Sequence, residues 1–175
     1  MSHAHDQLRY PMRDPTRSRG VLSRSRPWPL WTGVAAILVF GVDRLTKFWV
    51  THSLALGQQL WPRSPVHIYY TENSGAAFSI LPSADWLFLA VALAVVLVIA
   101  WRWRLLALQP WWVQTGVGLL LGGALANAVD RVTEGYVVDF IQFPHFPIFN
   151  VADSGITVGV VILLVRITLA GRAGA

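Results

Sequence analysis

The sequence predicts an all-α membrane protein with four transmembrane helices and a small β-sheet cradle outside the membrane. Hydrophobic residues make up 54% of the 175-residue chain and charged residues only 13%, whereas a typical soluble domain carries about 25% charged residues. Four apolar runs approach or exceed the length that a spanning helix needs, about 20 residues. If the four runs cross a membrane, most of the arginines lie on one side of it.

The apolar runs cover residues 30–50, 86–103, 111–129 and 154–171. The first run could instead be a cleaved signal peptide, which has a shorter core followed by a small-residue cleavage site. The charged segment from Asp43 to Lys47 stands in that place. We therefore expect the first run to be retained as a helix.

The placement of arginine predicts the orientation of the helices. Six arginines precede the first run, and the other arginines that lie away from the predicted outer face are Arg102, Arg104, Arg166 and Arg172. Arginine and lysine accumulate in cytoplasmic segments. Both termini and the link at 102–110 are therefore expected in the cytoplasm, and the connections at 51–85 and 130–153 are expected outside.

The chain is expected to divide into an arm and a membrane domain. Residues 1–28 are polar, Arg-rich and aperiodic, which is typical of a disordered segment. No aromatic–basic motif accompanies their charge, so we expect no nucleic-acid partner. Residues 29–175 form the predicted transmembrane domain. Short strands are expected at 58–61 and 66–71, within an outer β-cradle at about 51–83.

Polar residues gather at the predicted outer ends of the helices and in the outer connections. Charges at membrane depth are costly and are usually paired or functional. Every acidic residue after the arm lies on or near this face, so a polar site is expected there. The residues concerned are Asp43, Lys47, Asn73, Asn127, Asp130, Arg131, Asp139, Asn150 and Asp153.

Some of these residues have a structural explanation in their immediate neighbours. Asp43 and Lys47 are four residues apart, share a helix face and can form an ion pair. Asp130 adjoins Arg131, which can neutralise it, and Asn127 can hydrogen-bond to another helix. We expect them to support the site, although a direct part in the chemistry stays open.

Asp139 and Asp153 differ from the other acidic residues. Asp139 lies in the apolar stretch 137–141 with no cation beside it in the sequence, and burial without a partner raises the pKa of a carboxyl. Asp153 precedes the fourth run and could be its N-cap, where the helix dipole favours the anion. A plain capping role for Asp153 stays open. Two carboxyls whose pKa values are pushed apart suit acid–base chemistry.

Other chemistries have less support. The absence of Cys excludes a thiolate nucleophile and disulfides. Ser74, Ser79 and Ser154 lack a nucleophile motif, and His145 is expected to be a loop residue. A small proton-coupled transporter would also use intramembrane carboxylates. Transporters usually place them near the midplane between repeated halves, and this chain has no internal repeat.

Five segments, in order along the chain, resemble the motifs of the lipoprotein signal peptidases, or signal peptidase II. They are DRLTK at 43–47, NSGAAF at 73–78, GGALANAVDR at 122–131, VVDF at 137–140 and FNVAD at 149–153. The resemblance covers the chain from about residue 30 to its end. It implies four transmembrane helices, an outer β-cradle, and removal of the signal peptide from bacterial prolipoproteins just before a diacylglyceryl-modified Cys, with no metal or other cofactor.

The resemblance also implies residue roles and a setting. It places the catalytic pair at Asp139 and Asp153. Substrate-binding or site-shaping roles follow for Asp43, Lys47, Asn73, Gly75, Asn127, Asp130, Arg131, Asn150 and Ala152. The implied setting is the bacterial inner membrane, with the site at the extracytoplasmic face of a monomer that contacts its lipid-modified substrate and membrane lipids. Two features depart from the family: Ala126 replaces a glycine, and the connection from Asp139 to Asp153 is short.

Overall fold

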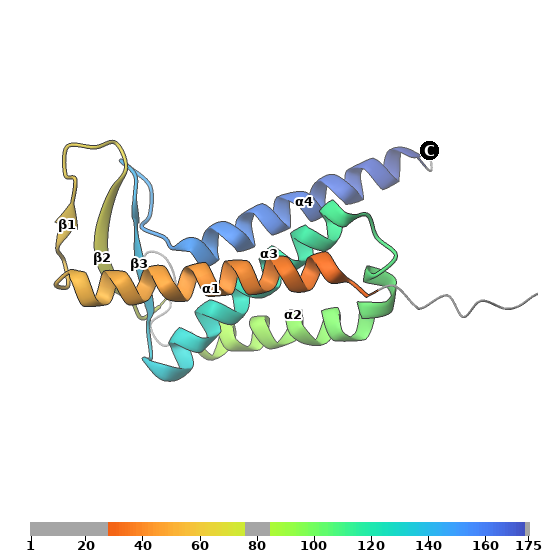
Figure 1. Cartoon of the computed structure of the whole chain (residues 1–175), viewed down its shortest axis with the longest axis horizontal. Helices are drawn as coiled ribbons and strands as arrows, with labels where there is room; N and C mark the ends of the chain where they lie inside the picture. Colours follow the sequence, from red (N-terminus) through yellow and green to blue (C-terminus); the bar gives the residue numbers. More distant parts are fainter. Residues whose placement is uncertain (1–27, 76–84, 174–175) are drawn as a thin grey trace, which may run out of the picture.

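The computed structural model describes residues 28–75 and 85–173. The predicted arm and part of the first outer connection therefore lie outside the described residues. The helices are α1 (Leu30–Ser53), α2 (Asp85–Leu106), α3 (Trp111–Thr133) and α4 (Val151–Ala173), and the strands are β1 (Gln59–Leu60), β2 (His67–Asn73) and β3 (Val137–Gln142). The sheet lies beyond one end of the helices, and the α2–α3 link and the end of α4 lie at the other (Figure 1).

Each predicted apolar run forms a helix. Three of the helices are long and apolar enough to cross a membrane, over residues 86–106, 111–133 and 151–172. α1 has a similar length, 24 residues, but it carries the charged segment from Asp43 to Lys47. Large hydrophobic side chains are exposed along the helices, as expected for a protein whose outer surface contacts lipid rather than water.

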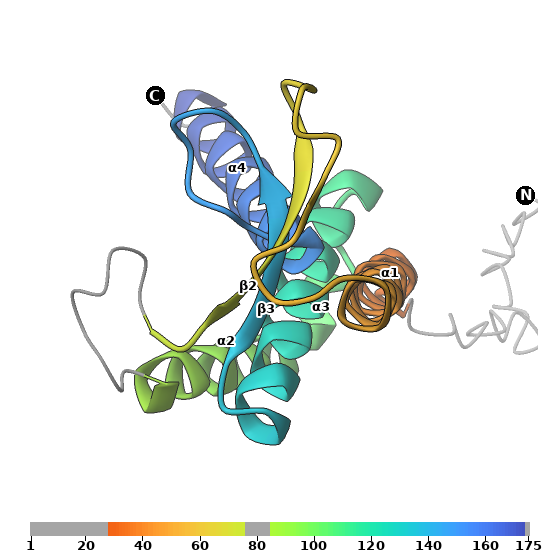
Figure 2. The same cartoon turned by 90° about the vertical axis from the view of Figure 1, so that its left-hand side faces the viewer.

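α3 occupies the middle of the helix bundle, between α2 and α4 (Figure 2), and packs against all three other helices. Small residues allow this close approach. A Cβ atom at Gly122 would overlap the backbone of Ala36 on α1, and one at Gly123 would overlap the backbone of Ala152 on α4. Lipid is as apolar as the helices themselves, so close van der Waals packing of this kind carries much of helix association in membranes.

The sheet is antiparallel, with β2 in the middle and β3 at one edge. The cradle predicted at about 51–83 is therefore incomplete, because its third strand comes from the second outer connection. The β3 sequence, VVDFIQ, is rich in β-branched and aromatic residues, which is a strand signal. Gly135 has a positive φ of 78°, which only glycine adopts readily, and it turns the chain from the end of α3 into β3.

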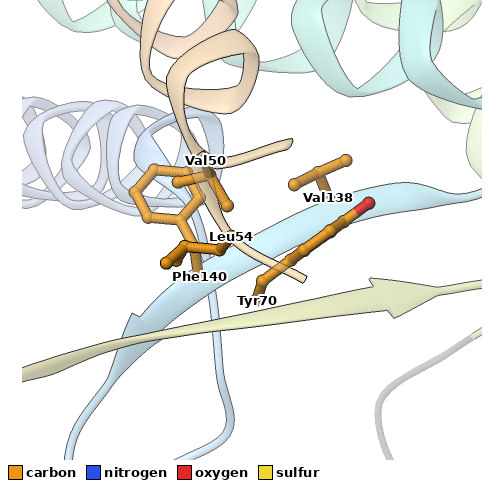
Figure 3. Close-up of a cluster of buried hydrophobic side chains, with 5 residues drawn as sticks. All are labelled: Val50, Leu54, Tyr70, Val138 and Phe140. Carbon is orange, nitrogen blue, oxygen red and sulfur yellow. The ribbon is translucent and has the colours of Figure 1, made fainter. Parts of the chain in front are cut away.

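A hydrophobic cluster fixes the sheet on the end of α1 (Figure 3). It comprises Val50, Leu54, Tyr70, Val138 and Phe140, each at most 7% exposed. Side chains alternate between the two faces of a strand. Because Val138 and Phe140 both enter the cluster, the intervening carboxyl of β3 must point to the other face of the sheet.

The close packing of α1 on α3 at Gly122 predicts that a larger residue there lowers the stability of the protein. Gly122→Ala should destabilise the protein, because the added methyl group would overlap the Ala36 backbone and overpacking costs about 1–3 kcal/mol. Gly41→Ala is the matched control, since a Cβ atom there meets nothing within 4 Å. Thermal unfolding in detergent should show a lower midpoint for Gly122→Ala alone, and equal midpoints for the two variants would contradict this packing.

Candidate active site

The predicted site residues meet at the end of the bundle where α1, α3 and α4 adjoin the sheet. They come from five elements and from the short segments beside them. α1 contributes Asp43 and Lys47; α3 contributes Asn127, Asp130 and Arg131; the end of β2 contributes Asn73 and Gly75; β3 contributes Asp139; and the start of α4 contributes Asn150, Ala152 and Asp153.

Lys47 lies at the centre of the buried charge. Its ammonium nitrogen is 2.7 Å from Asp43 Oδ2 and 2.6 Å from Asp130 Oδ2. It also donates a hydrogen bond to Asn127 Oδ1 at 2.9 Å. The ammonium group has three donors, and three acceptors surround it. Such pairing is what offsets the loss of hydration when charges are buried.

Asp43 connects α1 to α4. The predicted ion pair with Lys47 is confirmed, and the carboxylate has a second partner that was not predicted. Asp43 Oδ1 accepts a hydrogen bond from the backbone N–H of Ala152 at 2.8 Å. This N–H belongs to the first turn of α4, where backbone donors lack helical partners and the helix dipole favours an anion.

Asp130 forms ion pairs with two side chains of α1, Arg44 and Lys47. We expected the adjacent Arg131 to neutralise it, but neighbouring residues on a helix do not face each other. The structure places Arg44 Nη1 and Lys47 Nζ against its two carboxylate oxygens. Arg131 donates to the carbonyl oxygen of Asn127 at 3.3 Å, and its guanidinium lies 4.4 Å from the centre of the Phe88 ring.

Arg44 is a residue of the site that the sequence analysis did not assign. Its partner Asp130 is 86 positions away, and no local pattern links two residues so distant in sequence. The only signal was the presence of a charged segment inside an apolar helix, because charges at that depth are usually paired.

Asn127 links Lys47 to Asp153. Its oxygen accepts the hydrogen bond from Lys47, and its Nδ2 donates to Asp153 Oδ1 at 2.7 Å. The amide orientation is fixed by these contacts, since only the nitrogen end can donate and only the oxygen end can accept. The predicted hydrogen bond from Asn127 to another helix is confirmed.

Asn150 is the residue that caps α4. Its Oδ1 accepts from the backbone N–H of Asp153 at 2.8 Å, and its own N–H donates to Asp153 Oδ2 at 3.3 Å. This reciprocal pair forms a capping box, with Asp in the place of the usual Glu. The predicted N-cap at Asp153 is therefore wrong, because Asn150 is itself a strong capping residue. Asp153 lies in the first turn of α4, where the dipole still favours its anion.

Asp139 shares Asn150 with Asp153. Asp139 Oδ1 accepts from Asn150 Nδ2 at 2.7 Å, and its Oδ2 accepts from Asn73 Nδ2 at 3.0 Å. Burial, and then the negative charge of Asp153, raise the pKa of Asp139 to about 7, although both amide donors and Lys47 act in the opposite direction. The predicted rise of this pKa is confirmed. Near neutral pH the Asp139 carboxyl therefore holds a proton in a substantial fraction of molecules.

The remaining candidates have ordinary structural surroundings. The hydroxyl group of Ser154 donates to the carbonyl oxygen of Asn150 at 3.0 Å, and Ser79 lies outside the described residues. His145 lies between β3 and α4, as predicted, with a positive φ of 61°. Among residues 28–75 and 85–173, no group of three or more His, Asp or Glu side chains could hold a metal ion.

Residues 35–169 match the sequence profile of signal peptidase (SPase) II. This chain belongs to the signal peptidase II family. It is 44% identical over 139 residues to a lipoprotein signal peptidase of Nostoc punctiforme, a match that covers 75% of this chain and 85% of the relative. It is 40% identical over 135 residues to a lipoprotein signal peptidase of Streptococcus pneumoniae, covering 75% and 88%.

Two solved structures, each described as a bacterial membrane enzyme, have a fold similar to that of this chain. The first has a TM-score of 0.75 and 28% identity, and the match covers 86% of this chain and 95% of the other. The second has a TM-score of 0.70 and 29% identity, with 81% and 96% covered. The comparisons give no support to the transporter hypothesis.

The buried ion pairs of Lys47 predict a large loss of stability when this side chain is removed. Lys47→Ala should sharply lower the folded yield and the thermal midpoint, because breaking a buried ion pair costs about 3–5 kcal/mol. Arg44→Gln should cost less, since Arg44 is 37% exposed and Asp130 keeps its contact with Lys47. Cleavage per folded molecule should largely persist in both variants. Normal yield with abolished cleavage in Lys47→Ala would instead place Lys47 in the chemistry.

Proposed function

We propose that this protein is an aspartic endopeptidase that removes the signal peptide from lipid-modified prolipoproteins, cutting just before the diacylglyceryl-modified Cys. The observation that carries the proposal is that Asn150 donates hydrogen bonds to both Asp139 and Asp153, which brings the two carboxyls into one site. Burial and the charge of Asp153 also raise the pKa of Asp139 to about 7. A carboxyl that holds a proton and a neighbouring carboxylate can supply the acid and the base of one hydrolysis.

In the proposed mechanism, ionised Asp153 takes a proton from a water molecule as the water oxygen bonds to the scissile carbonyl carbon. Asp139 donates its proton to the carbonyl oxygen. When the tetrahedral intermediate collapses, the C–N bond breaks and the proton on Asp153 passes to the leaving amine. Asp139 takes back a proton from the hydroxyl group of the intermediate that becomes the new carbonyl oxygen. The pair then holds one proton, as at the start, and neither a metal nor another cofactor takes part.

The amide side chains support this division of roles. Asn73 and Asn150 both donate to Asp139, so they hold its carboxyl in place on the face of the sheet opposite the hydrophobic cluster. Asn127 and the Asn150 backbone hold Asp153. The charged groups around Lys47 fix the ends of α3 and α4, which position Asn127 and Asn150. We therefore propose that these charged groups are positioning residues.

We further propose that all four helices of the domain at 29–175 span the bacterial inner membrane. The 24 residues of α1 extend over about 36 Å at 1.5 Å per residue, more than the hydrocarbon thickness of about 30 Å. Its charged residues Asp43 and Lys47 are buried against α3 and α4 rather than facing lipid. The arginine excess supports a cytoplasmic location for both termini and, with it, a location of the carboxyl pair at the outer face.

The catalytic prediction concerns Asp139 and Asp153. The purified protein should release the signal peptide from a lipidated prolipoprotein, and Asp139→Asn or Asp153→Asn should abolish this release while leaving folding and substrate binding largely intact. The two side chains act as one unit, so the double variant should be little worse than either single variant. Gel analysis of the cleaved product, with substrate retention measured in parallel, separates chemistry from binding.

Asp130→Asn is the control for this experiment, because Asp130 is a buried carboxylate of the same site that is paired with cations. It should reduce activity through stability and not eliminate it. Substantial cleavage by Asp139→Asn, together with none by folded Asp130→Asn, would show that the pair is Asp130 and Asp153.

The orientation is tested by labelling, which the absence of Cys makes simple. A Cys introduced at Gln109, in the α2–α3 link, should be protected from an impermeant maleimide in intact spheroplasts and labelled after lysis. A Cys at Ser64, between β1 and β2, should react in both preparations. Labelling of the Gln109 position in intact spheroplasts would contradict the proposed orientation.

A further inference from the structure

An apolar groove lies on the helix bundle, on a different part of the molecule from the carboxyl pair. α3 forms its floor with Val117 and Leu120, α2 forms one wall, and Leu163 of α4 contributes to the other. α3 lies between α2 and α4 (Figure 2), and the residues that line the groove come from these three helices. Its volume is about 430 Å³, within the range of about 300–1,000 Å³ for ligand pockets.

One end of this groove is cationic. Arg102, near the end of α2, belongs to its lining, and the Arg102 guanidinium lies over the Trp101 ring at 4.5 Å from the centroid. No carboxylate in the described part of the chain forms an ion pair with Arg102. The described acidic residues lie toward the opposite end of the bundle, in α1, in α3 and at its C-cap Glu134, in β2 and β3, and in the first turns of α2 and α4.

Aromatic pairs mark the same end of the bundle. The rings of Trp28 and Trp103 are 5.4 Å apart, and those of Trp31 and Trp111 are 6.4 Å apart. Tryptophan is enriched at the level of the lipid headgroups. The Arg102 guanidinium is therefore at the depth of lipid phosphates, and the apolar groove runs from it toward the membrane interior.

We propose that this groove binds one acyl chain of an anionic phospholipid from the cytoplasmic leaflet, with the lipid phosphate held by Arg102. A guanidinium matches phosphate geometry well. Apart from Arg102, the groove is lined only by apolar side chains, which suit contact with an acyl chain. The helix of a signal peptide is a less suitable occupant, because its positively charged N-terminal region would lie beside the Arg102 guanidinium and be repelled by it. The proposal uses the proposed orientation and is independent of the cleavage chemistry.

The test is native mass spectrometry of the full chain with phosphatidylglycerol and with phosphatidylcholine of the same acyl chains. The protein should retain phosphatidylglycerol in preference, and Arg102→Gln should lower that retention about five-fold, the effect of about 1 kcal/mol per cation. Arg172→Gln is the matched control, since Arg172 is near the end of α4 and outside the groove lining. Ala94→Trp should fill the groove and lower retention of both lipids.

The outcomes separate this proposal from its alternatives. Equal retention of the two lipids would overturn it, because no anionic headgroup would then be selected. Equal loss in Arg102→Gln and Arg172→Gln would overturn it in favour of diffuse surface attraction. If Ala94→Trp weakens substrate binding and leaves lipid retention unchanged, the groove holds the signal peptide and the lipid proposal is wrong. Arg102→Gln should keep normal cleavage of the lipidated substrate, so failure of the lipid site and failure of the proposed function give different results.

Discussion

The fold around the site depends on the ion pairs of the buried Lys47 ammonium group, which join the helix ends from which the site is built. It binds Asp43 on its own helix and Asp130 on α3, and Asp43 in turn holds the first turn of α4 through Ala152. Three helix ends are therefore joined around one charge. A charge buried at this depth must be paired, so the arrangement leaves little freedom in how α1, α3 and α4 meet. Lys47 also donates a hydrogen bond to Asn127, which in turn donates one to Asp153. These two hydrogen bonds connect the ion pairs to the proposed catalytic pair.

The supporting acids and the proposed catalytic Asp139 differ in whether a cation lies within ion-pair distance of the carboxyl group. Asp43 and Asp130 are almost completely buried, yet each has a cation within ion-pair distance. Asp139 is equally buried, but its hydrogen-bond partners are the neutral amides of Asn73 and Asn150. Burial, and then the negative charge of Asp153, raise its pKa to about 7. The site thus contains two kinds of buried acid, those paired with cations and one held by neutral amides, and a pKa near 7 suits the second kind to proton transfer near neutral pH.

The sequence predicted those parts of the structure that depend on local pattern. The helices follow from long apolar runs, the Asp43–Lys47 pair from their spacing, and the raised pKa of Asp139 from its apolar neighbours. The features that were missed depend on contacts between distant segments. β3 carries a local strand signal, but its place in the sheet depends on pairing with β2. Arg44 enters the site because α1 packs on α3. Asn150 is the cap because α4 begins at Val151, and its side-chain amide also donates to the Val138 carbonyl oxygen of β3.

The central claim is that Asp139 and Asp153 hold one proton between them near neutral pH, with the proton on Asp139. Infrared titration of the protein labelled with ¹³C at the aspartate carboxyls measures this directly, as the difference between wild type and Asp139→Asn. The account predicts a protonated-carboxyl band that is lost with a midpoint near the raised pKa of about 7 and that is missing in Asp139→Asn. A band lost near pH 4, the ordinary range for aspartate, or one that persists unchanged in Asp139→Asn, would contradict it.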